Sequence, residues 1–348
     1  MTQTRRARAL PNLGQVSIAV IGAGSWGTTV GVLAAQGNDT TLWARRQSLV
    51  EEMRGARCNT QYLPGATFPE RLAVSADLPA VVESADLVIM GVPSHGFRAV
   101  AQELAPHLRP GVALVSLSKG VEQGSLLRMT EVLAQTCPGH PVGVLTGPNL
   151  ASEVAAGFPA AAVVAMDDAA LASEVQRLLT TSWFRVYTND DLVGSEVAGA
   201  LKNVMAIASG MASGSGFGDN TRAALLTRGL AEMARLGVAL GGKVLTFLGL
   251  AGMGDLIATC TSTRSRNYTV GFRLGQGERL DDIVASMQMV AEGIKSTGPV
   301  LELAARVGVD MPIASEVGAA LYESRPVTEV VTNLLSREVS SEFAGLES

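Results

Sequence analysis

The chain has 348 residues, of which 47% are hydrophobic and 17% are charged, a composition typical of a globular protein of two domains and not of a disordered chain. The formal net charge of −5 at pH 7 gives no electrostatic reason to expect a nucleic-acid partner. Three cysteines and three histidines are scattered, without CxxC or HExxH spacing. We therefore expect no disulfide framework, no metal site and a reducing, cytoplasmic location. No apolar run approaches the ~20 residues of an integral membrane segment.

The first half of the chain alternates strand-like and helix-like segments. Residues 1–15 are basic and lack the apolar core of a secretory signal, so we expect a disordered leader there. Ala- and Leu-rich stretches with helical spacing, such as 28–36 and 96–107, separate β-branched runs. The predicted strands cover residues 16–21, 40–43, 87–92, 113–117, 142–146, 161–166 and 184–187. This alternation predicts an α/β Rossmann-type, doubly wound sheet over residues 16–193.

After about residue 190 the strand signal fades, which predicts an all-α C-terminal domain over residues 194–340 and a polar tail over 341–348. Asp219-Asn220 suits a helix start and Gly237 a helix stop. A largely apolar helical domain is compatible with a homodimer. The predicted helices cover residues 192–211, 221–240, 280–290, 294–307 and 314–322.

A glycine pattern follows the first predicted strand and opens a helix. In Gly22-Ala-Gly24-Ser-Trp-Gly27, the first glycine permits a tight turn. The second lets a pyrophosphate approach the backbone, and the third lets the helix pack closely on the strand. The helix N-terminus adds N–H donors and a partial positive charge. The segment therefore predicts dinucleotide binding.

The residues after the second strand predict which dinucleotide is bound. NAD-specific proteins usually have Asp or Glu there to bond the ribose 2′-hydroxyl, whereas this chain has Arg45 and Arg46. A guanidinium group suits a 2′-phosphate and can stack on adenine. We therefore expect NADPH to be preferred over NADH, although a solvated arginine pair would give the same pattern.

Two lysines are candidates for the chemistry. Lys119 follows a predicted strand end, where open α/β sheets bind ligands, and its cation could polarise a substrate oxygen or hold a phosphate. Lys202 lies on a predicted helix among small apolar neighbours, so we expect burial to disfavour the protonated form of its amine. Such an amine suits general acid–base catalysis. The alternatives are a solvated loop lysine for Lys119 and a snorkelling lysine for Lys202.

A polar run downstream offers further ligands. Asp255 is flanked by glycines and apolar residues, and could orient Lys202, bond a substrate hydroxyl or cap a helix. The run from Thr259 to Asn267 brings hydroxyls, the two guanidinium groups of Arg264 and Arg266 and an amide into one short segment, a set that suits a phosphate. A polar turn is the alternative.

Together these residues resemble the bacterial NAD(P)-dependent glycerol-3-phosphate dehydrogenases from about Ile18 to Leu335. The set is specific because most dehydrogenases share only the first motif. The motifs are GAGSWG (22–27), VPSH (92–95), SKG (118–120), TGPNLASE (146–153), GALKNVMAI (199–207), TRGLAEM (227–233), GMGDLIATCTSTRSRN (252–267) and VAEG (290–293).

The resemblance implies NAD(P)H-dependent, reversible reduction of dihydroxyacetone phosphate to sn-glycerol 3-phosphate, which supplies phospholipid synthesis. It implies that Lys202 donates the proton to the carbonyl, with Lys119 and Asp255 beside it. The cofactor would contact Gly22, Gly24, Ser25, Trp26, Gly27, Arg45, Arg46, Lys119, Ala151, Arg266, Val290 and Glu292. The substrate would contact Lys119, Gly147, Asn149, Lys202, Asp255, Ser265, Arg266 and Asn267.

One departure from the family and two alternatives stay open. The family usually has Ser or Thr followed by Phe where this chain has Asn149 and Leu150, and an asparagine keeps the ability to form hydrogen bonds at this position. A β-hydroxyacid or ketopantoate-type reductase would share the two-domain pattern but bind a carboxylate. A non-catalytic NADPH-sensing regulator would need the glycine pattern but not Lys119, Lys202 and Asp255 together.

Overall fold

The computed structural model describes residues 16–287, 291–338, 341–342 and 344–346. The leader predicted over residues 1–15 lies outside these ranges, as does the predicted cofactor ligand Val290. The described residues form two compact units. The first comprises those of 1–118 and 128–192, and the second those of 119–127 and 193–348. The segment 119–127 therefore belongs to the helical unit, although it follows a strand of the first unit.

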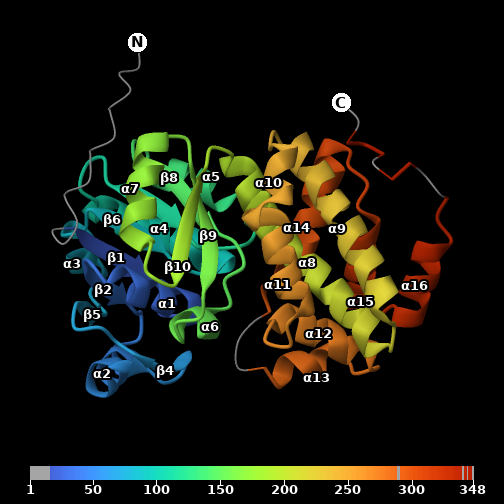
Figure 1. The fold of residues 1–348 in the computed structure, drawn as a ribbon, viewed down its shortest axis with the longest axis horizontal. Helices are drawn as coiled ribbons and strands as arrows, with labels where there is room; N and C mark the ends of the chain where they lie inside the picture. The colour runs from blue at the N-terminus through green and yellow to red at the C-terminus, as the bar shows by residue number, and fades with distance from the viewer. Residues whose placement is uncertain (1–15, 288–290, 339–340, 343, 347–348) are drawn as a thin grey trace, which may run out of the picture. The chain divides into compact units, whose positions relative to one another are not determined.

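The first unit is built on an eight-stranded sheet with the order β10-β9-β8-β7-β6-β1-β2-β5 (Figure 1). From β5 to β8 this is the strand order of a Rossmann fold, and all pairs are parallel except β8 with β9. The predicted fold class is confirmed. The strands are β1 (Ser17–Ile21), β2 (Asp39–Trp43), β5 (Leu72–Ser75), β6 (Leu87–Met90), β7 (Ala113–Ser116), β8 (Val142–Thr146), β9 (Ala160–Met166) and β10 (Phe184–Asn189).

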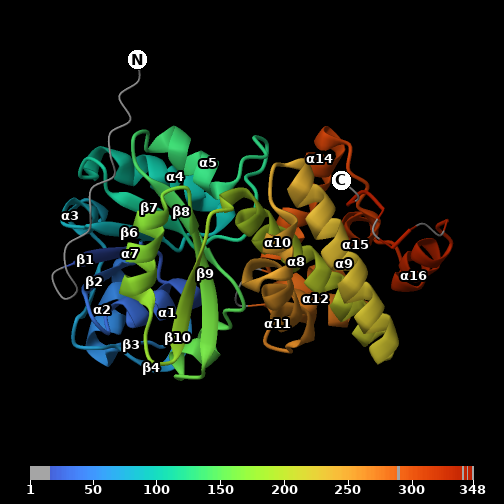
Figure 2. The ribbon, with the colours of Figure 1, turned by 45° about the horizontal axis from the view of Figure 1, so that its top comes forward.

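Helices pack on the sheet in two groups, as the right-handed crossovers on either side of β1 require. Helix α1 contacts β1 and β2 and packs against α6 and α7, whereas α4 packs against α3 and α5 (Figure 2). Every residue of β6 and β7 is buried, and all but Ser116 are apolar, as expected for a sheet covered on both faces. The helices are α1 (Ser25–Ala34), α2 (Gln47–Ala56), α3 (Leu78–Glu83), α4 (Ser94–Leu104), η1 (Ala105–His107), α5 (Met129–Thr136), α6 (Ala151–Ala155) and α7 (Ala169–Leu179).

Three strands of the first unit have no counterpart among the predicted segments. Strand β5 lies at the edge of the sheet beside β2, with Trp43 paired to Ser75. It is only four residues long, and such a run is hard to distinguish from a loop by periodicity. The other two form a short antiparallel hairpin, β3 (Cys58–Asn59) with β4 (Leu63–Thr67).

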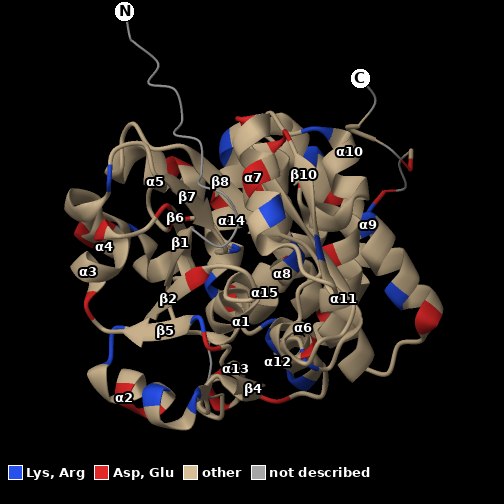
Figure 3. Ribbon diagram, turned by 60° about the vertical axis from the view of Figure 1, so that its left-hand side comes forward, with Lys and Arg blue, Asp and Glu red and all other residues tan. Residues whose placement is uncertain are grey.

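The second unit is helical, as predicted. Nearly every residue of α8 (Leu192–Gly214) is buried, which is consistent with its mostly apolar sequence. Basic and acidic residues are interspersed along the more polar α9 (Asp219–Ala239) (Figure 3). The others are α10 (Val244–Leu248), η2 (Leu250–Gly254), α11 (Asp255–Thr261), α12 (Arg266–Gly275), α13 (Leu280–Ala285), α14 (Glu292–Val307), α15 (Pro312–Tyr322) and α16 (Val327–Leu335).

Glycines let α8 and α12 meet backbone to backbone. A Cβ on Gly210 would lie 2.1 Å from the carbonyl oxygen of Tyr268, and one on Gly271 would lie 1.9 Å from that of Ile207. Both distances are far below van der Waals contact, so neither position can carry a side chain without separating the helices. This contact fixes α12, whose first residues are candidate substrate ligands, against the helix that carries Lys202.

Two helix ends were predicted wrongly. Gly237 does not end α9, which continues to Ala239. A Cβ at this glycine would lie 2.0 Å from the ring of Phe247, so its role is close packing. Helix α13 ends at Ala285 and not at residue 290, because the Ser286 hydroxyl donates to the carbonyl oxygen of Ile283 at 2.7 Å and competes with the helical pattern.

None of the helices in the described ranges has the length and apolar character that crossing a bilayer requires.

Candidate active site

The glycine turn, Gly22–Gly27, has the geometry that dinucleotide binding requires. Gly22 has φ 116°, and a Cβ there would lie 2.5 Å from the carbonyl oxygen of Gly91, which follows β6. A Cβ on Gly27 would lie 2.0 Å from the carbonyl oxygen of Gly22. A Cβ on Gly24, by contrast, would meet no atom within 4 Å. The outer glycines thus bring β1, β6 and α1 together, while Gly24 presents bare backbone to open space.

This turn lies where the order of the strands reverses, between β1 and β6. The N–H of Gly91 donates to the carbonyl oxygen of Ile21 at 2.8 Å, and that of Gly22 to Trp43 at 3.0 Å. Open α/β sheets bind ligands at the carboxyl ends of strands at such a point. Gly24 has no side chain to cap α1, so the N–H groups of the first helical turn suit a pyrophosphate. The residues present therefore fit a dinucleotide.

The arginine pair lies at the carboxyl end of β2, next to this turn in the sheet. Arg45 and Arg46 are both exposed. Arg46 is the residue before α2, and its guanidinium donates to Oε1 of Gln61 at 2.5 Å and to the hydroxyl of Tyr62 at 3.3 Å. The guanidinium is thus partly oriented before any ligand binds.

The β8–α6 connection adds further predicted residues to the first unit. Gly147 has φ 125°, and a Cβ there would lie 3.2 Å from the Cα of Ala162. The carbonyl oxygen of Ala151 accepts a hydrogen bond from Thr29 of α1 at 3.2 Å. The side-chain oxygen and nitrogen of Asn149 are both buried and have no hydrogen-bond partner among the described residues. Nε1 of Trp26 is likewise buried without a hydrogen-bond partner among the described residues. Unpaired buried groups are costly unless something binds them, so they suit a ligand.

In the helical unit, two lysines converge on one aspartate, and we call Lys119, Lys202 and Asp255 the lysine–aspartate cluster. Lys202 Nζ donates to Oδ1 of Asp255 at 2.8 Å and to the hydroxyl of Thr259 at 2.7 Å. Lys119 Nζ donates to Oδ2 of Asp255 at 2.5 Å. Lys202 is 7% exposed and Asp255 is 1% exposed. Lys202 is therefore buried, as predicted, and Asp255 is the first residue of α11 and not its cap.

Burial and the excess of positive charge set the protonation of this cluster. Burial lowers the pKa of Lys119 to about 8, with the ammonium of Lys202 acting in the same direction and the Asp255 carboxylate opposing it. For Asp255, burial alone would raise the pKa, but the ammonium groups of Lys119 and Lys202 lower it overall. A carboxylate that stays ionised beside a lysine that titrates near neutral pH suits proton transfer.

The start of α12 lies in the same unit. Asn267 is buried, donates to Oδ1 of Asn203 at 2.9 Å and accepts from the N–H of Gly293 at 2.9 Å. Asn203 in turn donates to the carbonyl oxygen of Lys119 at 3.4 Å. Ser265 caps α12 by accepting from the N–H of Tyr268.

Glu292 interacts electrostatically with the two lysines of the cluster and with Arg266. Burial raises the pKa of Glu292, whereas the positive charges of Arg266, Lys202 and Lys119 oppose the shift. The structure therefore brings the two lysines and the aspartate together with Arg266, Asn267 and Glu292.

Sequence reasoning did not predict the partners of two polar residues of this site. Thr259 accepts from Lys202, and it lies four residues after Asp255, on the same face of α11. Asn203 follows Lys202 directly and links Asn267 to the Lys119 segment. The helical spacing could have revealed Thr259, but nothing in the sequence indicated the partners of Asn203.

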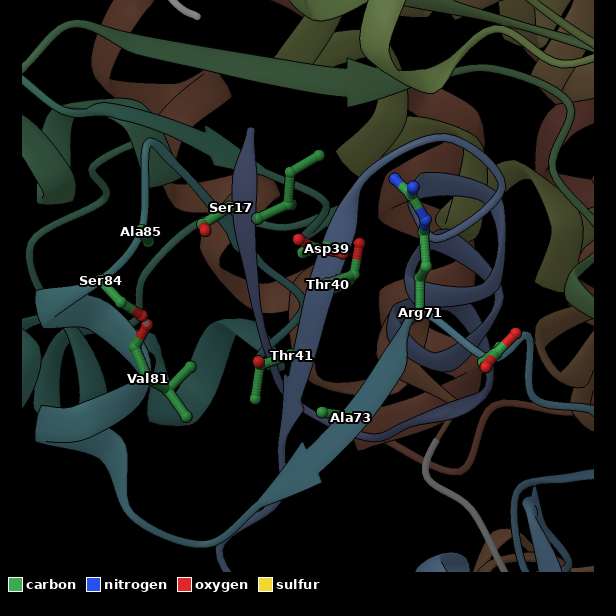
Figure 4. A pocket seen from close by; sticks show the side chains of 11 residues that line it. Ser17, Asp39, Thr40, Thr41, Arg71, Ala73, Val81, Ser84 and Ala85 are labelled. Carbon is green, nitrogen blue, oxygen red and sulfur yellow. Dashed lines mark hydrogen bonds between the residues drawn. The ribbon is translucent and has the colours of Figure 1, made fainter. Parts of the chain in front are cut away.

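A separate hollow of about 310 Å³ lies at the amino ends of β1, β2 and β5 (Figure 4). Its wall includes Ser17, Asp39 and Arg71, and none of the predicted site residues lines it. It is at the opposite end of these strands from the glycine turn. Among the described residues, no group of three or more His, Cys, Asp or Glu side chains could hold a metal ion.

A dinucleotide-binding sheet, followed by a helical unit with two lysines on a buried aspartate, defines the protein as an NAD(P)-dependent dehydrogenase. Residues 17–172 match the family NAD-dependent glycerol-3-phosphate dehydrogenase N-terminus, and residues 191–332 match its C-terminus. The chain belongs to this glycerol-3-phosphate dehydrogenase family.

Individual relatives agree with this assignment. The chain is 50% identical over 328 residues to "Glycerol-3-phosphate dehydrogenase [NAD(P)+] 2" of Sphingopyxis alaskensis, covering 94% of this chain and 98% of the relative. It is 50% identical over 329 residues to the Geobacter sulfurreducens enzyme, covering 93% and 98%. The crystal structure of glycerol-3-phosphate dehydrogenase from Coxiella burnetii has a TM-score of 0.89 and 38% identity, covering 93% and 99%.

A ketopantoate reductase from Ralstonia eutropha is more distant, with a TM-score of 0.58 and 16% identity, covering 90% of this chain and 99% of that one. This likeness shows a shared fold alone.

Proposed function

We propose that the protein catalyses the reversible NAD(P)H-dependent reduction of dihydroxyacetone phosphate to sn-glycerol 3-phosphate. The observation that carries the proposal is the buried lysine–aspartate cluster, in a chain 50% identical to named glycerol-3-phosphate dehydrogenases. The product is a backbone precursor of glycerophospholipids, so the proposal includes a role in their synthesis. It also includes a cytoplasmic location.

Lys202 is proposed as the acid that completes the reduction. A bound reduced nicotinamide supplies the hydride, and the carbonyl oxygen becomes an alkoxide as C2 turns tetrahedral. The Lys202 ammonium then donates a proton to this oxygen and is reprotonated from solvent, while Asp255 and Thr259 hold Nζ in place. Lys119 contributes a second positive charge that stabilises the developing alkoxide. In the oxidative direction the same amine accepts the proton.

The phosphate of the substrate requires an anion site away from the reacting carbon. We assign Arg266 and Asn267 to it, together with Ser265, because a guanidinium, an amide and a hydroxyl suit phosphate oxygens. Gly147 and Asn149 are the proposed contacts in the first unit. Binding energy at the phosphate aligns the carbonyl for reaction.

The cofactor is assigned to the glycine turn and to residues near it in the first unit. Ser25 and Trp26 begin α1, and Ala151 begins α6 beside it. Arg45 and Arg46 are proposed to hold the 2′-phosphate of NADPH. From the second unit, Lys119, Arg266, Glu292 and Val290 complete the proposed set.

The decisive experiment follows the oxidation of NADPH by absorbance at a fixed concentration of dihydroxyacetone phosphate, and repeats it with NADH. We expect turnover with dihydroxyacetone phosphate and little with a panel of 2-keto acids, including ketopantoate, and competition by inorganic phosphate. Preferred turnover of a keto acid would support a ketopantoate-type reductase instead. Tight cofactor binding without turnover of any substrate would support a non-catalytic regulator.

A homodimer is part of the same proposal, since a largely apolar helical unit suits association. Size-exclusion chromatography with light scattering should give twice the 36.0 kDa chain mass. A monomer at micromolar concentration would contradict it.

A further inference from the structure

Asn59 is a fully buried polar residue that the proposed mechanism does not use. It lies in the two-residue strand β3, outside the main sheet, and its side chain is 0% exposed. Its Nδ2 donates to the carbonyl oxygen of Ala23 at 2.9 Å and to the hydroxyl of Thr28 at 2.8 Å. Its Oδ1 accepts from the N–H of Tyr62 at 3.1 Å. The amide is therefore bonded through both of its polar atoms, and those bonds join two separate segments.

The two acceptors of the Asn59 amide lie within the glycine turn and directly after it. Ala23 lies between Gly22 and Gly24, and Thr28 follows Gly27. A third bond joins the same segments, from the Ser25 hydroxyl to the carbonyl oxygen of Tyr62 at 2.6 Å. The connection between β3 and β4 thus holds the turn at both ends and near its middle.

A glycine-rich turn needs such restraint more than other loops do. Glycine loses more conformational freedom on ordering than any other residue, and a Cβ added at Gly24 would meet no atom within 4 Å, so this part of the turn faces open space. The carbonyl of Ala23 must also point away from an incoming pyrophosphate, because two negative groups would repel each other. A hydrogen bond from Asn59 holds this carbonyl toward the protein interior.

We propose that Asn59 is a positioning residue that holds the glycine turn in the shape that accepts the dinucleotide pyrophosphate. The inference rests on the proposed function only in that the turn binds a dinucleotide. Since NADPH and NADH share the pyrophosphate, loss of Asn59 should weaken both equally. This separates its role from that of Arg45 and Arg46, whose loss should weaken NADPH more than NADH.

The test measures the Kd of both cofactors by nucleotide fluorescence, without turnover, and then kcat at saturating cofactor. Asn59→Ala should raise both Kd values about tenfold, as expected for loss of a buried hydrogen-bonding group, with kcat within about twofold of wild type. Thr28→Val is a milder variant that keeps the side-chain shape and removes one acceptor. It should raise both Kd values about threefold, and Thr28→Ser, which retains the hydroxyl, should restore them.

Asn38 is a matched control in the same unit. It is 1% exposed, and its Nδ2 donates to the carbonyl oxygens of Ala34 at 3.0 Å and Leu178 at 3.3 Å, at the other end of α1. Asn38→Ala should lower Tm as Asn59→Ala does and leave both Kd values unchanged.

Three outcomes would overturn the inference. Equal weakening of cofactor binding by Asn38→Ala would reduce the role of Asn59 to general stability. Unchanged Kd values in both Asn59→Ala and Thr28→Val would show that Asn59 does not affect cofactor binding. If Asn59→Ala fails to fold, unchanged Kd values in Thr28→Val alone would overturn the inference. Wild-type protein that binds neither dinucleotide would overturn the proposed function as well, whereas wild-type binding without turnover of dihydroxyacetone phosphate would overturn the proposed function alone.

Discussion

Lys202 Nζ lies 2.8 Å from Oδ1 of Asp255, and Oδ2 of the same carboxylate accepts from Lys119. One buried carboxylate thus serves two ammonium groups, and the cluster carries a net positive charge. Burying charges is costly unless they are paired, so a cluster with two ammonium groups on one carboxylate suits an anionic ligand or a developing alkoxide. This relationship underlies the first two predictions.

Lys202→Ala should lower kcat about a thousandfold, within the range that a positioned general acid contributes. Asp255 keeps Lys119 as its partner, so no buried carboxylate is left unpaired and the protein should fold. Cofactor Kd should stay within about twofold of wild type. Steady-state kinetics and fluorescence titration measure both quantities, with the exposed Lys295→Ala as a control. Near-normal turnover would refute the assignment.

The pH dependence of the two directions should be opposite. Reduction needs a protonated cluster, and the pKa of Lys119 is about 8. The value of kcat/KM for reduction should therefore fall as pH rises through about 8, while that for oxidation should rise. Asp255→Asn removes the carboxylate that raises the pKa of Lys119, and should move the midpoint to lower pH. A midpoint that does not move would exclude this cluster as the titrating group.

The arginine pair should set the cofactor preference. Arg46→Ser should lower the ratio of kcat/KM for NADPH to that for NADH about tenfold, because a charge-assisted hydrogen bond to the 2′-phosphate is lost. Arg185→Ser makes the same charge change on β10, at the opposite edge of the sheet, and should leave the ratio unchanged. Wild-type protein that uses both cofactors equally well, or NADH better, would contradict the predicted preference.

Glu232 should make stability depend on pH. Its carboxylate is 2% exposed and accepts from the N–H groups of Ile313 and Ala314 at the start of α15. Burial raises its pKa to about 7, although these two N–H groups and Arg235 oppose the shift and Asp310 adds to it. The folded state therefore binds a proton more tightly than the unfolded state, whose carboxyl titrates near 4.5.

This contribution to stability is present below about pH 4.5 and is lost as pH rises to about 7. Its size is on the order of 3 kcal/mol. Glu232→Gln should remove it, so that Tm varies less between pH 5 and pH 8 than in wild type. Glu302→Gln, at an exposed position on α14, should leave the profile as it is. Parallel profiles for wild type and Glu232→Gln would argue against the raised pKa.

The strands and the glycine turn could be predicted because their signals are local. The run from Ser17 to Ile21 is mostly apolar and rich in β-branched residues. Gly22, Gly24 and Gly27 follow it at the spacing typical of a tight turn from a strand into a helix. Strand β5 was missed because four residues carry too little periodicity. The role of Gly237 was predicted wrongly because the sequence does not distinguish a glycine that makes room for a neighbouring ring from a glycine that ends a helix.

The sequence by itself determined the fold class, the dinucleotide turn and the identity of Lys119, Lys202 and Asp255 as candidates, since each depends on residues near one another in the chain. Only the tertiary structure decided that these three side chains share one set of hydrogen bonds, that segment 119–127 belongs to the helical unit, and that Asn59 braces a turn over thirty residues away. Hydrogen bonds depend on distances of a few ångströms, and the spacing of residues along a chain does not encode which distant segments come within that range.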